Sequence, residues 1–236
     1  MSAIYYMDPK NTMTIDSPYI TMVAGGKLLP IDGYNIKLLF RHSLRPPLKG
    51  TLYPDNILLS DEGINLARRL GASFDIPIGE CHSSFVPRCI QTIESILYGA
   101  NQDSKIEVSN GVLSDGFFSD KTIASKTFRE TSLKAVVLRL VNGETPNGFI
   151  SVDIGVKSLL DYIFTTGNHT NTIDLYCTHD FQLSLLDSLM YNKYNDIMTI
   201  EERWPNMLEG MWFWGKRNNF YCIWRGNCRH FVNYVL

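Results

Sequence analysis

The chain has 236 residues, of which 44% are hydrophobic, and this is enough to bury the core of one large domain or two small ones. Its 22 basic and 24 acidic residues give a formal net charge of -2, which excludes a general electrostatic attraction to nucleic acid or to an anionic membrane. No linker, charge run or repeat divides the sequence. We therefore expect one domain over residues 1–236, with a candidate small cap over about 101–148.

The cysteines and the N-terminal residues indicate where the protein is located. Five cysteines are an odd number, and none of them form a C-x-x-C pair, so neither a disulfide framework nor a zinc site is expected. The N-terminal sequence has no basic region followed by an apolar one, and no apolar run approaches the roughly 20 residues of a membrane span. We expect a cytoplasmic protein with free thiols and no membrane partner.

The first hundred residues alternate apolar runs with helical patterns. Residues 1–30 are predicted to be irregular or edge structure, with a hairpin around residues 24–26. The run 35–40 predicts a buried strand, which must end before the prolines of the next loop. The following predicted elements are a helix over 60–70 that Ser60 caps, a strand over about 79–83, and a helix over 86–98.

The second half of the chain begins with a mixed segment, 106–147, to which the pattern assigns no element. The later predicted elements are a helix over 149–164, a strand over 172–178, a helix over about 181–190, and antiparallel strands in the aromatic tail. Strands that alternate with helices are typical of an α/β sandwich with a largely parallel sheet. The ends of such strands are where ligand sites form.

The first candidate site segment, Arg41-His42-Ser43-Leu44-Arg45, follows the first predicted strand. The two arginines disfavour a protonated imidazole and should lower the pKa of His42. A neutral ring nitrogen can attack phosphorus while the guanidinium groups hold the phosphate oxygens. The alternative interpretation is a solvated basic loop with a surface histidine.

The second candidate segment spans residues 81–92 and places Arg88 in the first turn of a predicted helix. The amides of a helix N-terminus and an arginine together make an anion site. The alternative is an exposed arginine at a helix start, which is common. We expect His82, near the strand end, to be a structural residue.

The third candidate segment is Thr178-His179-Asp180, between a predicted strand and a predicted helix. His179 could donate a hydrogen bond to phosphoryl oxygens. Asp180 could protonate the leaving alkoxide and then deprotonate the attacking water. The alternative role for Asp180 is a plain helix N-cap.

In this order the three segments resemble the histidine phosphatase superfamily. Its R-H-G-x-R motif is matched by residues 41–45, its L-T/S-x-x-G helix start by 59–63, its S-S-x-x-x-R-x-x-Q-T motif by 83–92, and its strand-ending histidine by His179. The resemblance covers roughly Asn35 to Met190. It implies a three-layer α/β sandwich with the phosphoglycerate mutase-like fold. It also implies that His42 is phosphorylated in a pocket formed by Arg41, Arg45, Arg88 and His179.

The resemblance leaves the branch of the superfamily open. In the acid-phosphatase-like branch the proton donor is the aspartate of a His-Asp pair, which favours Asp180, and Pro46 and the segment 204–209 are similar to that branch. In the mutase-like branch the donor follows the second motif, where Asp115 and Asp120 lie.

One departure from the family pattern is Ser43, which stands where the family has glycine. Glycine there permits close backbone approach or a positive φ, so we expect the loop to sit slightly differently.

The function implied by the resemblance is hydrolysis of a small phosphomonoester through a phosphohistidine. No metal or other cofactor is expected, because arginines supply the positive charge. A metal site built on His42, His179 and Asp180 is disfavoured, because the adjacent arginines would repel a cation. The alternatives are a phosphomutase with the same intermediate and a non-catalytic phosphate-binding protein on the same fold. The sequence specifies neither the substrate nor the oligomeric state.

Overall fold

A seven-stranded sheet lies at the centre of the computed structural model, which describes residues 5–7, 13–15, 29–30, 33–47, 56–109, 111–167, 169–191 and 197–234. The strands are β1 (Tyr5–Met7), β2 (Met13–Ile15), β3 (Asn35–Arg41), β4 (Ile78–Ser84), β5 (Ile106–Ser109), β6 (Thr172–Thr178), β7 (Gly210–Lys216), β8 (Asn219–Trp224) and β9 (Asn227–Val232). The helices are α2 (Asp61–Gly71), α3 (Pro87–Gly99), α4 (Lys121–Glu130), α5 (Leu133–Val141), α6 (Val152–Thr165), α7 (Asp180–Met190) and α8 (Ile197–Arg203).

The central sheet has the strand order β5-β4-β6-β3-β7-β8-β9. Its first four strands in this order run parallel, and β7, β8 and β9 extend it as an antiparallel meander. The aromatic tail thus forms the antiparallel strands that its sequence predicts. β1 and β2 pair with each other in a separate antiparallel sheet.

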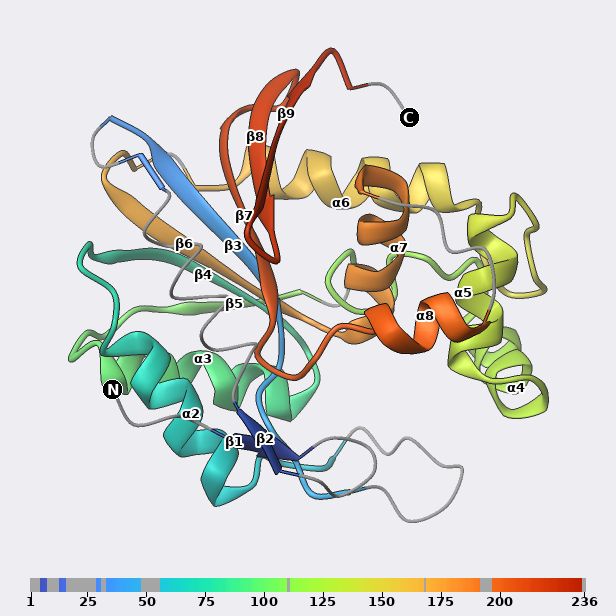
Figure 1. Ribbon diagram of the computed structural model, residues 1–236, viewed down its shortest axis with the longest axis horizontal. Helices are drawn as coiled ribbons and strands as arrows, with labels where there is room; N and C mark the ends of the chain where they lie inside the picture. Colours follow the sequence, from blue (N-terminus) through green and yellow to red (C-terminus); the bar gives the residue numbers. More distant parts are fainter. Residues whose placement is uncertain are drawn as a thin grey trace.

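Helices cover both faces of the sheet (Figure 1). Alternate residues of β3 point to opposite sides, because side chains alternate along a strand. Ile36, Leu38 and Phe40 join a hydrophobic cluster with α2 and α3, whereas Leu39 joins a second cluster with α5, α6 and α7. The predicted three-layer α/β sandwich with a largely parallel core is confirmed.

Several predicted elements are confirmed to within a few residues. The strand 172–178 is β6, and the helix predicted over 60–70 is α2, where the Ser60 side chain accepts from Gly63 N. The unassigned segment 106–147 contains β5, α4 and α5. The hairpin predicted around residues 24–26 lies outside the described residues.

Close packing of α2 against α3 positions the second motif. A Cβ atom on Gly99 would lie 1.8 Å from the carbonyl oxygen of Arg68, and one on Gly71 would lie 1.9 Å from that of Ile96. Only glycine permits this approach of the two backbones. The helix that carries Arg88 is therefore held directly against the helix that follows the first motif.

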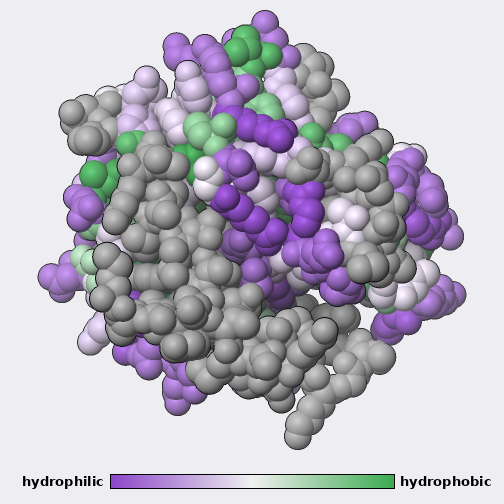
Figure 2. Space-filling model, viewed as in Figure 1, coloured by the Kyte–Doolittle hydropathy of each residue, from purple (hydrophilic) through white to green (hydrophobic). Residues whose placement is uncertain are grey.

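The described surface is mostly hydrophilic on the face shown in Figure 2, with hydrophobic residues in small groups. The exposed large hydrophobic side chains come from separate elements and include Tyr98, Val108, Ile154 and Val232. Scattered residues of this kind are normal on a protein surface. Within the described ranges, no helix combines the length and apolarity needed to cross a membrane.

Candidate active site

The three candidate segments meet at the carboxyl ends of β3, β4 and β6. Arg41 and Thr178 are register partners at the ends of the parallel strands β3 and β6. The backbone N–H of His42 donates to the carbonyl oxygen of Thr178 at 3.1 Å. The rings of His42 and His179 lie edge to face, with centroids 5.6 Å apart. This is the edge of an α/β sheet at which ligands bind.

His42 is held with one ring nitrogen engaged. The residue is 2% exposed, and its Nδ1 lies 2.9 Å from the carbonyl oxygen of Ser43. Because a carbonyl only accepts, Nδ1 carries the proton and Nε2 keeps its lone pair. Burial and the charge of Arg41, with smaller contributions from His179 and Arg88, lower the pKa of His42 well below 6.5. The ring is therefore neutral at pH 7.

Ser43 is well accommodated in place of the family's glycine. Its backbone N–H donates to Thr92 Oγ1 at 3.0 Å, and its Oγ donates to the carbonyl oxygen of Gly63 at 2.7 Å. Its φ is not among the positive values of the described residues. The loop therefore needs no left-handed residue here, and the serine hydroxyl ties it to α2.

The same loop touches the start of α2 at Gly63. The carbonyl oxygen of Leu44 accepts from Ser60 N at 3.0 Å, and a Cβ on Gly63 would lie only 2.0 Å from that oxygen. The glycine of the Leu59–Gly63 segment therefore leaves room for the loop that follows His42.

Arg41 has one buried donor available for a ligand. Its Nη2 lies 2.7 Å from Asp180 Oδ2, and its Nη1 donates to the carbonyl oxygen of Pro205 at 2.6 Å. Its Nε is buried, and no group of the described residues accepts its proton. A buried donor without a partner costs free energy, which a phosphoryl oxygen bound there would recover.

Asp180 is the first residue of α7, and the N-cap position belongs to His179. Its Oδ2 accepts from Trp204 Nε1 at 3.1 Å in addition to Arg41. Burial acts to raise the pKa of this carboxyl, but the charge of Arg41, with smaller contributions from His179, Trp204 and Arg45, outweighs it and holds the pKa below its usual value. In the free protein Asp180 is therefore a carboxylate at neutral pH.

Arg45 and Arg88 border this group of residues. Arg88 follows the first residue of α3, and its charge helps to lower the pKa of His42. Arg45 is partly exposed, donates to the carbonyl oxygen of Pro46 at 3.0 Å, and contributes to the lowered pKa of Asp180. All four residues of the predicted phosphate pocket thus act on His42 or Asp180.

The segment 204–209 forms a wall of the site that the sequence indicated only through a faint similarity. Besides the contacts of Trp204 and Pro205, Leu208 N donates to the carbonyl oxygen of His42 at 3.1 Å. The backbone N–H of Arg41 donates to the carbonyl oxygen of Glu209 at 2.9 Å. These contacts arise because β7, which follows the segment, pairs antiparallel with β3.

The other residues considered have contacts elsewhere. Asp115 pairs with Lys121 at 3.1 Å, and Asp120 caps α4 by accepting from Ile123 N at 2.9 Å. His82 is a structural residue, as expected: its ring nitrogens meet Tyr162 Oη and Glu80 Oε2, both at 3.0 Å.

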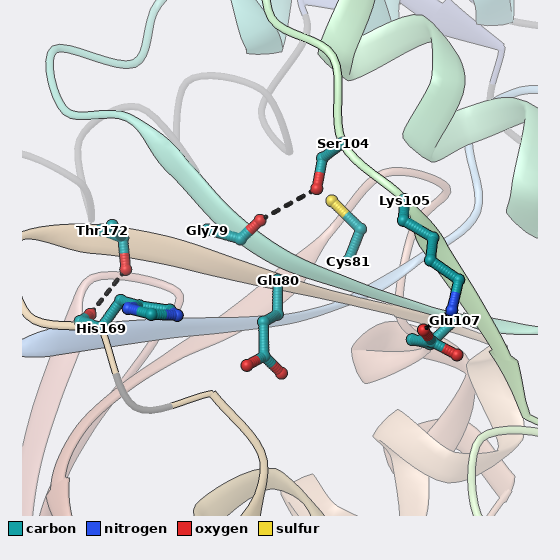
Figure 3. Close-up of a pocket in the computed structure, with 8 residues that line it drawn as sticks. All are labelled: Gly79, Glu80, Cys81, Ser104, Lys105, Glu107, His169 and Thr172. Atoms are coloured by element: carbon teal, nitrogen blue, oxygen red, sulfur yellow. Dashed lines mark hydrogen bonds and ion pairs between the residues drawn. The ribbon is translucent and has the colours of Figure 1, made fainter.

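A hollow of about 550 Å³ lies near the amino ends of β4 and β6, whereas the candidate segments meet at the carboxyl ends of the strands (Figure 3). It is lined by Gly79, Glu80, Cys81, Ser104, Lys105, Glu107, His169 and Thr172. No residue of the candidate segments that meet at His42 contributes to it except Cys81. Within the described residues, no cluster of three or more His, Cys, Asp or Glu side chains has the geometry of a metal site.

No protein-family model and no curated protein matches the sequence. In structure, the chain is similar to two solved proteins named mycobacterial hydrolase 1 and mycobacterial hydrolase 2. Each is 11% identical with a TM-score of 0.50, and the match covers 86% of this chain and 100% or 91% of theirs. It is also similar to a phosphoglycerate mutase from Bacillus anthracis, with 14% identity, a TM-score of 0.49, and coverage of 84% and 92%.

At this level of identity, the likeness to the two hydrolases concerns the fold alone. They match almost from end to end, so the likeness spans the whole sandwich and not a single βαβ unit. The strand order and the ordered motifs agree with it. The chain therefore has the fold of these two hydrolases over most of its length.

Proposed function

We propose that the protein is a phosphatase that hydrolyses a small phosphomonoester through a phosphohistidine on His42. The observation that carries this proposal is the state of His42. Its Nδ1 is fixed by the carbonyl oxygen of Ser43 and its lowered pKa keeps the ring neutral. Nε2 is therefore a nucleophile at neutral pH, in surroundings whose positive charges favour an incoming phosphate dianion.

In the first step, Nε2 of His42 attacks phosphorus and the bond from phosphorus to the ester oxygen breaks. Arg41, Arg45, Arg88 and His179 hold the phosphoryl oxygens, and the leaving alkoxide takes a proton from Asp180. In the second step, Asp180 removes a proton from water, whose oxygen attacks the phosphohistidine. Inorganic phosphate leaves, and His42 and Asp180 return to their starting states.

Asp180 must be protonated before the first step, although Arg41 keeps it ionised in the free protein. A phosphate dianion bound beside the carboxylate opposes the charge of Arg41 and raises the pKa of Asp180. We therefore expect the reaction to be fastest at acidic pH.

The contact of Asp180 with Arg41 supports Asp180 as the donor, as in the acid-phosphatase-like branch, because it fixes the carboxyl beside a phosphate-binding guanidinium.

A phosphomutase that uses the same intermediate is the second candidate. It is favoured by the place of Asp115, which directly follows Ser114. The Ser114 hydroxyl donates to Ser84 Oγ at 2.7 Å, and Ser84 contacts His179. The segment that carries the mutase-type donor therefore borders the site. The carboxylate of Asp115 itself pairs with Lys121.

The test is a panel of phosphorylated metabolites incubated with the protein in EDTA, with phosphate release and product structure measured. We expect phosphate release and an acid-labile ³²P label on His42. A product whose phosphoryl group has only changed position would identify a mutase. Activity that disappears in EDTA and returns with a divalent cation would contradict the metal-free mechanism.

A further inference from the structure

His179 makes both of its described hydrogen-bonding contacts through one ring nitrogen. Its Nε2 lies 2.9 Å from Ser84 Oγ and 3.8 Å from Cys89 Sγ. Both partners belong to the end of β4 and the first turn of α3. The ring nitrogen that remains for a phosphoryl oxygen is therefore Nδ1. It can donate a hydrogen bond there only if it carries a proton.

The hydroxyl of Ser84 receives hydrogen bonds from two donors. Ser114 Oγ donates to it at 2.7 Å, and Val86 N donates to it at 3.3 Å. Ser114 also has the carbonyl oxygen of Ser109 within reach, but at 3.2 Å, so the shorter contact selects Ser84. With two donors directed at its oxygen, Ser84 has its own proton left to donate. The acceptor beside it is Nε2 of His179.

Ser114 is held firmly in this position. It lies between β5 and α4, is 6% exposed, and has its carbonyl oxygen bonded by Gln182 Nε2 at 2.7 Å. Its hydroxyl also accepts from Phe85 N at 3.3 Å. A buried hydroxyl fixed from both sides is suited to set the direction of a hydrogen-bond chain.

We propose that Ser114, which lies outside the motifs, is a positioning residue that sets the tautomer of His179 through Ser84. The chain runs from Ser114 to Ser84 to Nε2, so the proton of the neutral imidazole stays on Nδ1, the nitrogen left for a phosphoryl oxygen. Without Ser114, Ser84 can reverse and accept from a proton on Nε2. Nδ1 would then present a lone pair to the phosphoryl oxygens and repel them. The catalytic consequence rests on the proposed function, whereas the tautomer does not.

The tautomer is measured by NMR of the free protein labelled with ¹⁵N-histidine, at a pH where the spectrum shows a neutral His179 ring, with His179→Gln to assign the signals. We expect wild-type His179 to carry its proton on Nδ1, and Ser114→Ala to shift the population towards Nε2. Ser114→Thr keeps the hydroxyl and should restore the wild-type spectrum. Ser95→Ala is the matched control, because Ser95 is 7% exposed and its hydroxyl donates to the backbone of Gln91.

A second experiment measures the affinity of the protein for orthovanadate, a probe that binds without being turned over. Ser114→Ala should weaken binding about 3- to 30-fold, as expected for a neutral hydrogen bond lost and partly replaced by repulsion. With a substrate, KM should rise by a similar factor. Ser95→Ala should change neither quantity.

Three results would overturn the proposal. They are a wild-type His179 with its proton on Nε2, a tautomer that Ser114→Ala leaves unchanged, and an equal effect of Ser95→Ala. The first needs no variant, so the proposal can be tested even if Ser114→Ala does not fold. If the tautomer responds as expected but vanadate does not bind the wild-type protein, the proposed function fails and the positioning role stands.

Discussion

Two buried histidines illustrate how environment divides roles between identical side chains. His82 is 4% exposed and His42 is 2% exposed, so burial does not distinguish them. Both ring nitrogens of His82 are engaged by Glu80 and Tyr162, and its ring stacks on Tyr176 at 4.8 Å. Among the described residues, His42 has only Nδ1 engaged. A ring with both nitrogens hydrogen-bonded has a structural role. A neutral ring that keeps the lone pair of one nitrogen beside arginines can attack phosphorus.

His42→Ala should therefore lower phosphatase activity by about 10⁴-fold or more, because the nucleophile is removed, while the protein still folds. His82→Ala is the matched control, since it should lower the melting temperature but leave the folded protein active. Turnover and thermal unfolding of both variants are the measurements. Substantial activity in a folded His42→Ala protein would refute the assignment of the nucleophile.

Asp180→Asn should slow phosphoryl transfer most for esters with poor leaving groups, such as sugar or alkyl phosphates. A high-pKa alkoxide needs a proton as it departs, whereas p-nitrophenolate hardly does, and general acid catalysis contributes about 10²- to 10⁴-fold. The measurement is kcat for alkyl and p-nitrophenyl phosphates, with Asp115→Asn and Asp120→Asn as controls. If a control shows the leaving-group dependence and Asp180→Asn does not, the donor belongs to the mutase-like branch.

The helices and strands that the sequence predicted are those whose boundaries are set by residues close in the sequence. β6 is an apolar run with clear ends, and α2 has its own capping serine, so the sequence predicted both. The segment 106–147 gave no such signal. Its core residues, such as Phe117 and Leu140, share a hydrophobic cluster with residues of α7, which lies about 40 or more residues further along the chain. The wall at 204–209 likewise depends on the pairing of β7 with β3, which no local pattern encodes.

The close contact between α2 and the loop after His42 gives a prediction at this scale. Gly63→Ala places a methyl carbon only 2.0 Å from the carbonyl oxygen of Leu44, so either the helix or the loop must shift. We expect a loss of roughly 1–3 kcal/mol in the free energy of unfolding. Activity should fall as well, because a small displacement of the nucleophile is costly.

Gly111→Ala is the control for this prediction, because a Cβ there would meet its nearest atom at 3.8 Å, an ordinary contact. Chemical denaturation and kcat of both variants are measured under the same conditions. A Gly63→Ala protein as stable and active as the control would show that the loop adapts without cost.

For the whole molecule, the candidate site couples stability to pH although the net charge is only -2. Burial and neighbouring cations lower the pKa of His42 in the folded state, while the unfolded chain has the ordinary value near 6.5. The arginine beside Asp180 likewise keeps its folded pKa below the ordinary value of about 3.9. In both cases the unfolded state takes up its proton first as the pH falls. Acid therefore destabilises the fold in two windows, below about pH 6.5 through His42 and below about pH 3.9 through Asp180.

His42→Asn should remove the first window. Asparagine can still donate a hydrogen bond to the carbonyl oxygen of Ser43, but it has no charge to gain in the unfolded state. The free energy of unfolding of the wild-type protein should fall between pH 6.5 and about pH 5, with His42 contributing at most about 1.4 kcal/mol per pH unit. The variant should lack this contribution.

Urea denaturation over a pH series measures both slopes, and pH 7.5–8.5 is the control range, because there His42 is neutral in both states. Equal slopes below pH 6.5 would mean that His42 takes up its proton in the folded protein as readily as in the unfolded chain, and the neutral nucleophile would then be wrong.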